Sequence, residues 1–315
     1  MTYISGRRHF IKTASAWPLA VAASVGRPDA AARQEPVQRS GGPRLKLSLN
    51  VYSFNAALLP PAGGGTPATT LHEVLELCSR ENLDGIDPTG YYFPGYPRVP
   101  PDSFLNEFKR RAFHLGIEIT GTGVRNNFAQ ADKAKRASDV QLVKDWIEVA
   151  AKLGAPVIRV FAGAESEGHS RADVSEWMAA DLKTCAEYGQ RYGVVVGIQN
   201  HGDFLRTSEQ VLQIVKMVGS EWFGVIVDTG NFQIGDPYEE IGRVVPYAVS
   251  FQVKESPYGN ASPIRMDLAR LVRVIRAGGY RGYLPVETLA APGQPYDPFM
   301  RVPNFARQVR DAIEG

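Results

Sequence analysis

The sequence is poor in cysteine and has no long apolar run. Its 315 residues include two cysteines, Cys78 and Cys185, which fall in separate segments with helical periodicity. We therefore expect two buried free thiols, although a disulfide between them is the alternative in an oxidising compartment. No stretch of about 18 apolar residues follows the N-terminal region, so the mature chain is predicted to be soluble and to have no membrane partner.

An excess of positive charge is also lacking. The chain has 35 Lys and Arg residues against 33 Asp and Glu residues, a formal net charge of +2. Residues 1–32 contain four basic residues and one acidic residue, so the remainder carries a net charge of −1. This balance lacks the basic surface of nucleic-acid-binding proteins, and no nucleic acid is expected as a partner.

The N-terminus differs in composition from the rest of the chain. The segment SGRRHFIK places Arg7 and Arg8 shortly before Phe-Ile-Lys, and a short apolar stretch leads to the small residues 30–32. This order is typical of a twin-arginine signal peptide over residues 1–32. It predicts export to the periplasm or elsewhere outside the cytoplasm, whereas a basic tail without a targeting role is the alternative. Residues 33–44 are expected to be a linker.

From residue 45 to residue 315, strand-like apolar runs alternate with amphipathic helical stretches. Strands are predicted at residues 46–54, 85–92, 117–124, 156–163, 194–201, 223–232, 248–255 and 283–289. Helices are predicted at residues 71–83, 101–115, 134–153, 172–192, 208–218, 237–245, 267–277 and 298–314. These eight β-then-α units predict an α/β fold, a single-domain (β/α)8 TIM barrel. A doubly wound sheet is the alternative, but no Gly-rich phosphate-binding motif supports it.

Polar side chains gather where the last four predicted strands end, which is where this fold builds its active sites. Gln199, Asp228, Gln252 and Glu287 would converge if their faces point into the barrel. Two carboxylates and two amide oxygens form a hard-ligand set that suits Mg²⁺ or Mn²⁺ better than Zn²⁺. Structural polar groups at the barrel rim are the alternative. The Pro/Gly-rich segments 60–69 and 290–298 are expected to form loops at this mouth, the first of them as a lid.

Four short segments carry a resemblance to a known family. QNHG (199–202), VDTGNF (227–232), VKE (253–255) and VET (286–288) resemble the sugar phosphate isomerase/epimerase-like group of xylose isomerase-like TIM barrels, over residues 45–315. The resemblance implies one divalent metal held by Glu, Asp, His and Glu, with the two glutamates moving a proton next to a carbonyl. Asp228 and Glu287 match this pattern, whereas Gln252 stands for the His and Gln199 for the first Glu.

Gln199 removes one of the two bases that the resemblance implies. An amide can bind a metal through oxygen but cannot accept a proton as a general base. His201, on the same strand face, and Lys254 are therefore predicted to join Glu287 as catalytic residues, and a nearby metal is expected to lower the pKa of Lys254. Substrate contacts are predicted for Asp87, Arg159, Asn200 and Asn231.

The combined reading predicts an exported, divalent-metal-dependent enzyme acting on a keto-sugar or an oxidised glycoside. It would abstract a proton next to a carbonyl, with isomerisation, epimerisation or β-elimination as the outcome; the loss of one base favours a lyase. A non-catalytic sugar-binding barrel with a decayed metal site is the alternative. A barrel nuclease is disfavoured, because such enzymes resemble His-rich three-zinc sites and this chain has five His residues in all. Whether the protein forms a homo-oligomer stays open.

Overall fold

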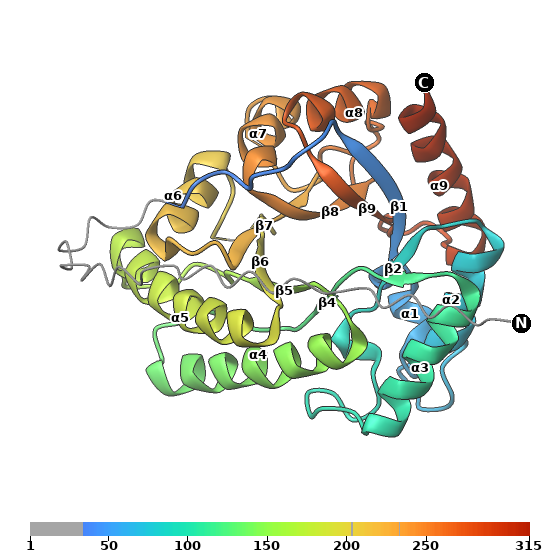
Figure 1. The fold of residues 1–315 in the computed structure, drawn as a ribbon, viewed down its shortest axis with the longest axis horizontal. Helices are drawn as coiled ribbons and strands as arrows, with labels where there is room; N and C mark the ends of the chain where they lie inside the picture. The colour runs from blue at the N-terminus through green and yellow to red at the C-terminus, as the bar shows by residue number, and fades with distance from the viewer. Residues whose placement is uncertain (1–33, 203, 233) are drawn as a thin grey trace, which may run out of the picture. The chain divides into compact units, whose positions relative to one another are not determined.

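The computed structural model describes residues 34–202, 204–232 and 234–315, so the predicted signal peptide lies outside the described residues. Nine parallel strands form one sheet in the order β3-β2-β1-β9-β8-β7-β6-β5-β4 (Figure 1). They are β1 (Arg44–Asn50), β2 (Gly85–Asp87), β3 (Glu118–Ile119), β4 (Thr122–Gly123), β5 (Val157–Phe161), β6 (Val195–Gln199), β7 (Phe223–Asp228), β8 (Ala248–Lys254) and β9 (Arg281–Glu287).

The sheet closes because β3 and β4 are two halves of one barrel strand. β3 pairs with β2 and β4 pairs with β5, so the two short segments join the ends of the sheet. The predicted (β/α)8 barrel is confirmed, with eight strand positions. A glycine allows the second half to lie so close to β5, because a Cβ atom on Gly123 would come within 2.8 Å of the Arg159 guanidinium.

Helices cover the outside of the barrel, as Figure 1 shows. The α-helices are α1 (Asn55–Leu58), α2 (Leu71–Arg80), α3 (Asp102–Leu115), α4 (Lys133–Leu153), α5 (Arg171–Tyr192), α6 (Ser208–Val218), α7 (Pro237–Val244), α8 (Leu268–Ala277) and α9 (Pro298–Glu314), and the 3-10 helices are η1 (Val51–Phe54), η2 (Gly90–Tyr92) and η3 (Val245–Tyr247). Gly154 and Gly193 end α4 and α5 with φ of 80° and 70°. Helix termini leave carbonyls that this left-handed turn satisfies.

The apolar side chains form one core between the strands and the helices. Because helices cover the outer face of the parallel sheet, the strands are continuous apolar runs rather than alternating ones. Cys78 and Cys185 lie in this core as free thiols, which confirms the expectation. No helix among the described residues is long and apolar enough to cross a membrane.

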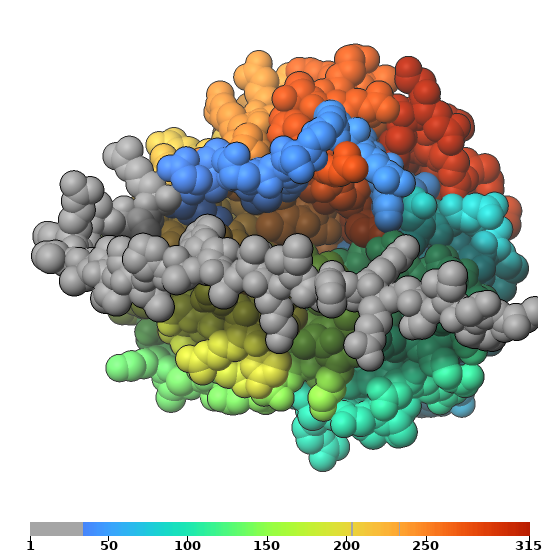
Figure 2. Space-filling view, viewed as in Figure 1, coloured from blue at the N-terminus to red at the C-terminus, as the bar shows by residue number. Residues whose placement is uncertain are grey.

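The first described segment covers the amino-terminal ends of β7 and β8. The Val37 amide donates to the Pro246 carbonyl at 2.9 Å, and the Arg39 guanidinium donates to the carbonyl of Ala248, the first residue of β8. Figure 2 shows this segment, in blue, lying along the surface next to the yellow and orange elements. The predicted linker therefore packs on the barrel at the end opposite to the polar strand ends.

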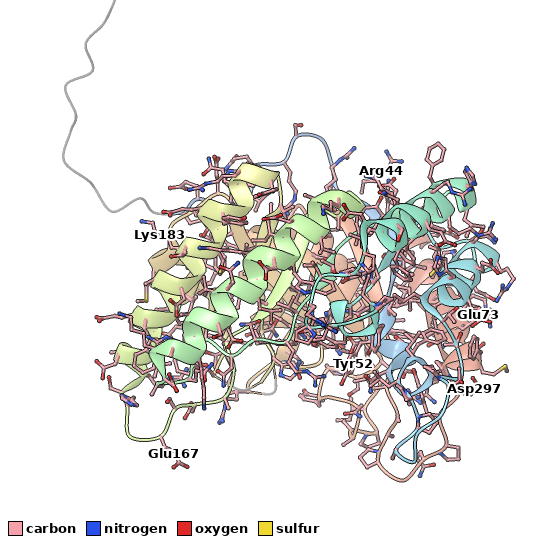
Figure 3. The ribbon with its side chains drawn as sticks, turned by 90° about the horizontal axis from the view of Figure 1, so that it is seen from below. Arg44, Tyr52, Glu73, Glu167, Lys183 and Asp297 are labelled. Carbon is pink, nitrogen blue, oxygen red and sulfur yellow. The ribbon has the colours of Figure 1, made fainter. Side chains whose placement is uncertain are left out.

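The two ends of the barrel are separated in Figure 3. Arg44, at the start of β1, lies toward the upper edge, whereas Tyr52, just after the end of β1, lies toward the lower edge. Glu167 and Asp297, which belong to the loops after β5 and β9, also lie in the lower half of this view. The carboxyl ends of the strands and their loops thus share one face of the molecule.

Trp146 of α4 is expected to be a major stabilising side chain. It is fully buried, its indole nitrogen donates to the Pro97 carbonyl at 2.9 Å, and its ring contacts Phe93 and Tyr96 edge-on. Trp146→Ala should lower the free energy of unfolding by about 3–5 kcal/mol, because it leaves a cavity and an unpaired carbonyl. Urea denaturation measures this loss.

The matched control is Phe113→Ala on α3. That ring is 81% exposed, so its removal should change the free energy of unfolding by less than about 0.5 kcal/mol. Equal effects of the two substitutions would contradict the packing described for Trp146.

Candidate functional site

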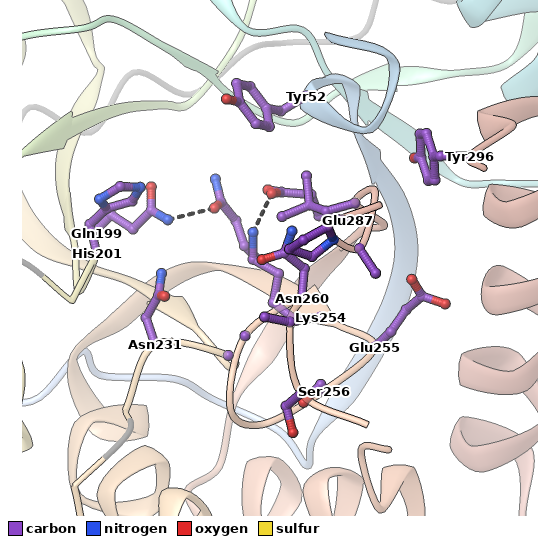
Figure 4. Close-up of a pocket in the computed structure, with 18 of the residues that line it drawn as sticks. Tyr52, Gln199, His201, Asn231, Lys254, Glu255, Ser256, Asn260, Glu287 and Tyr296 are labelled. Carbon is purple, nitrogen blue, oxygen red and sulfur yellow. Dashed lines mark hydrogen bonds and ion pairs between the residues drawn. The ribbon is translucent and has the colours of Figure 1, made fainter. Parts of the chain in front are cut away.

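A cavity of about 1110 Å³ opens at the carboxyl ends of the strands. Its floor is formed by Gln199, Gln252, Lys254 and Glu287 at the ends of β6, β8 and β9. Its walls come from η1, from the loop after β8 and from the loop after β9 (Figure 4). The parallel register places Asp228 beside Gln252 and Lys254 beside Glu287.

Gln199 connects three other side chains at the floor of this cavity. Its amide nitrogen donates to Asp228 Oδ2 and to Gln252 Oε1, both at 2.7 Å. Its amide oxygen accepts a hydrogen bond from Arg159 Nη1 at 3.0 Å. Since an ionised carboxylate only accepts hydrogen bonds and a guanidinium only donates them, these partners fix the orientation of the amide. The carbonyl oxygen of Gln199 therefore points to Arg159 and away from the carboxylates.

Lys254 lies between the two carboxylates of the site. Its ammonium is ion-paired with Glu287 Oε1 and lies 3.4 Å from Asp228 Oδ2. Burial alone would lower the pKa of Lys254, but Asp228 and Glu287 outweigh it, so the pKa is raised and the ammonium stays charged. The lowering of this pKa by a nearby metal stays a prediction.

The four residues predicted as metal ligands come together, but their donors face one another. Gln199 presents N–H groups to Asp228 and Gln252, and both carboxylates face the Lys254 ammonium. Within residues 34–202, 204–232 and 234–315, no group of three or more His, Cys, Asp or Glu side chains is placed to hold a metal ion. The residues present do not fit the predicted Mg²⁺ or Mn²⁺ in this arrangement.

Arg159, which lines the cavity, and the buried Asp87 form a second charged group. Arg159 stacks on the Phe161 ring at 4.4 Å and donates to the Tyr91 hydroxyl at 3.2 Å. Burial raises the pKa of Asp87 to about 6, with Arg159 opposing and Glu287 adding to the shift. Asp87 does not line the cavity, so its position does not support the predicted direct contact with a substrate.

Two of the other predicted residues line the cavity and one does not. His201 and Asn231 belong to its wall, with His201 packed edge-on against Phe161. Asn200 is fully buried instead, and its amide bonds both the N–H and the carbonyl of Asp228, at 2.8 and 2.9 Å. Asn200 therefore joins β6 to β7, and its place does not support the predicted substrate contact.

Sequence patterns missed the side chains that the loops contribute. Tyr296 donates to the Ser53 carbonyl at 2.7 Å, Asn260 donates to the Ala290 carbonyl at 2.6 Å, and Glu255 accepts from Arg301 at 2.7 Å. The predicted loop after β9 does line the cavity, but no residue of segment 60–69 does, so the expectation of a lid there is not supported. The sequence signal that could have identified such residues is the presence of tyrosine and asparagine in Pro/Gly-rich loops.

The comparisons with known proteins agree with this architecture. A sequence model of the xylose isomerase-like TIM barrel family matches residues 75–309. The chain belongs to this family. Comparison with curated proteins finds none that matches the sequence.

Solved structures of similar barrels superpose on most of the chain. A D-psicose 3-epimerase, determined in the presence of D-fructose, is 18% identical with a TM-score of 0.70, covering 86% of this chain and 100% of its own. A 3-keto-D-glucoside 4-epimerase from E. coli is 14% identical with a TM-score of 0.66, covering 85% and 100%. The IOLI protein, with a bound zinc atom, is 16% identical with a TM-score of 0.67, covering 85% and 98%. At these identities the likeness shows the fold alone.

Asp87 predicts a specific pH dependence of stability. Because its folded pKa is raised to about 6, the folded chain holds this proton more tightly than the unfolded chain, whose Asp pKa is about 3.9. The stabilisation is fully present below about pH 4 and is lost as the pH rises through about 6. Between pH 4 and pH 7 the natural protein should therefore lose about 2 kcal/mol of unfolding free energy relative to Asp87→Asn. Urea denaturation across this range measures the difference, and a difference independent of pH would contradict it.

Substitutions of Asn200 and Asn231 distinguish a residue that stabilises the fold from one that lines the cavity. Asn200→Ala leaves two buried backbone groups of Asp228 unpaired and should lower the free energy of unfolding by about 2–3 kcal/mol. Asn231→Ala, in the cavity wall, should change it by less than about 0.5 kcal/mol. Chemical denaturation of both variants checks the contrast, and equal stabilities would argue against the structural role of Asn200.

Proposed function

We propose that the protein is an exported enzyme that abstracts a proton next to the carbonyl of a keto-sugar or an oxidised glycoside. The observation that carries this proposal is the Glu287–Lys254 pair in the floor of the cavity. It sets a proton acceptor beside a fixed positive charge. That combination is what the formation of an enolate requires.

Each member of the pair has a separate role in the proposed reaction. Glu287, which is 4% exposed, takes the proton from the carbon next to the carbonyl. The electron pair of that C–H bond moves toward the carbonyl oxygen, where negative charge develops. The Lys254 ammonium, also in the cavity floor, stabilises that charge by a hydrogen bond.

The contacts of Gln199 support elimination over epimerisation. An epimerase needs a second proton-transfer group on the other face of the substrate, and the Gln199 amide cannot act as one. β-Elimination needs one base and a proton donor for the leaving group. His201 is the candidate donor, because histidine transfers protons near neutral pH and because Figure 4 shows it beside Gln199, away from Glu287.

The size and lining of the cavity support a substrate larger than one sugar ring. Its volume of about 1110 Å³ lies just above the range for small-molecule sites, roughly 300–1,000 Å³. Arg159, Asn231 and Tyr52 offer hydrogen-bonding groups in its wall. An exported enzyme would meet unphosphorylated glycosides, since sugar phosphates are cytoplasmic, and the two epimerases named above act on keto-sugars and on a 3-keto-glucoside by their names.

Glu287→Gln tests the proposal directly. The purified mature chain is incubated in deuterium oxide with a panel of keto-sugars and 3-keto-glycosides, and proton NMR follows deuterium incorporation and new products. The natural protein should exchange the proton next to the carbonyl or eliminate, and Glu287→Gln should slow this by about 10²–10⁴-fold.

Glu221→Gln is the control for this experiment, because Glu221 is exposed just before β7, at the other end of the barrel. Its rate should equal that of the natural protein. Saturable sugar binding with no exchange and no product would overturn the enzyme proposal in favour of a sugar-binding barrel.

A further inference from the structure

We infer that the Lys254 ammonium takes the place of the divalent metal ion in this barrel, so that the site is complete without one. The structural half of this inference stands on the contacts of Lys254 alone. Its catalytic half, in which the ammonium receives a substrate oxygen, rests on the proposed function.

The position of the Lys254 ammonium makes the binding of a metal ion at this site unfavourable. Asp228 is fully buried and Glu287 is nearly so, and both have Lys254 as their cation. Two buried carboxylates without a cation would be strongly unfavourable, so a positive charge is required here. A divalent ion placed between them would have to displace the ammonium, which would then itself be buried without a partner.

Gln199 is matched to a lysine in this position. A glutamate there would direct a third negative charge toward Asp228, whereas the amide donates a hydrogen bond to it. Gln199 and Lys254 thus act together: the amide removes one negative charge, and the ammonium supplies one positive charge where a divalent metal ion would supply two. The net charge of Asp228, Glu287 and Lys254 is −1.

The backbone around Lys254 is shaped to hold this side chain. A Cβ atom on Gly230 would lie 2.8 Å from Lys254 Cγ, so the glycine provides the space for the aliphatic stem. The Thr229 hydroxyl accepts a hydrogen bond from the Lys254 amide at 2.9 Å. The segment DTG at 228–230 therefore supplies a carboxylate, a backbone contact and room for the lysine. This is a built position rather than that of a solvated surface lysine.

The ammonium also has the capacity to receive a ligand. It carries three N–H donors, of which two are directed to Asp228 and Glu287. Lys254 lines the cavity, and the third donor is available to a carbonyl or hydroxyl oxygen of a sugar. A metal ion would bind such an oxygen in the same way, but with a larger charge.

Metal analysis of the natural protein is the first test. The mature chain is expressed with Mn²⁺ in the medium, and its metal content is measured by mass spectrometry; its melting temperature is then followed with EDTA, Mn²⁺, Mg²⁺ and Zn²⁺. We expect substoichiometric metal and no saturable shift of the melting temperature. One tightly held ion per chain, or a saturable rise with Mn²⁺, would overturn the inference.

The second test restores the glutamate at position 199 and removes the ammonium. Gln199→Glu combined with Lys254→Ala should create a site that takes up Mn²⁺ in calorimetry, with a stoichiometry near one and a rise in melting temperature. Gln199→Glu combined with Lys183→Ala is the matched control; Lys183 is exposed on α5 (Figure 3), so Lys254 stays in place and no uptake is expected. A folded Lys254 variant that binds no Mn²⁺, or equal uptake by both variants, would contradict the inference.

These measurements use no sugar, so their outcome is separate from that of the proposed function. If no substrate is found but the natural protein is metal-free, the proposed function fails and the structural half of the inference stands. If proton exchange is observed only with Mn²⁺ present, the enzyme proposal stands and the inference fails.

Discussion

The site depends on one electrostatic arrangement, in which the Lys254 ammonium is held between the carboxylates of Asp228 and Glu287. Neither carboxylate is exposed enough for water to stabilise its charge, so a cation must lie between them. The surrounding hydrogen bonds follow from this requirement. Gln199 donates to the same Asp228 oxygen that faces Lys254, and Arg159 in turn fixes the Gln199 amide.

The barrel makes this arrangement possible because parallel strands end at the same level. The register sets Lys254 beside Glu287 and Asp228 beside Gln252, so residues far apart in the chain become neighbours. Asn200 strengthens the junction of β6 and β7 from within the wall. Rigid strand ends hold charged groups more precisely than loops do, and the loops then determine the extent of the cavity.

The sequence allowed the barrel and much of the site to be predicted. The alternation of strand and helix patterns predicted the ring, and the spacing of two residues placed Gln199 and His201 on one face, where both line the cavity. The periodicity of the sequence could not show whether a polar side chain bonds the backbone or faces the cavity. Asn200 therefore was predicted as a substrate contact although both its amide atoms bond backbone, and the wall residues Tyr296 and Asn260 were missed because loops have no period.

The sequence by itself determined the (β/α)8 fold, the strand ends that form the site, and the replacement of a proton acceptor by the Gln199 amide. Only the tertiary structure decided which cation the carboxylates face. Lys254 and Glu287 are separated along the chain, and the distance between their charges depends on strand register and on the space above Gly230. Residue types fix the charges that a site can contain, whereas the packing of backbone against side chain fixes which of them meet.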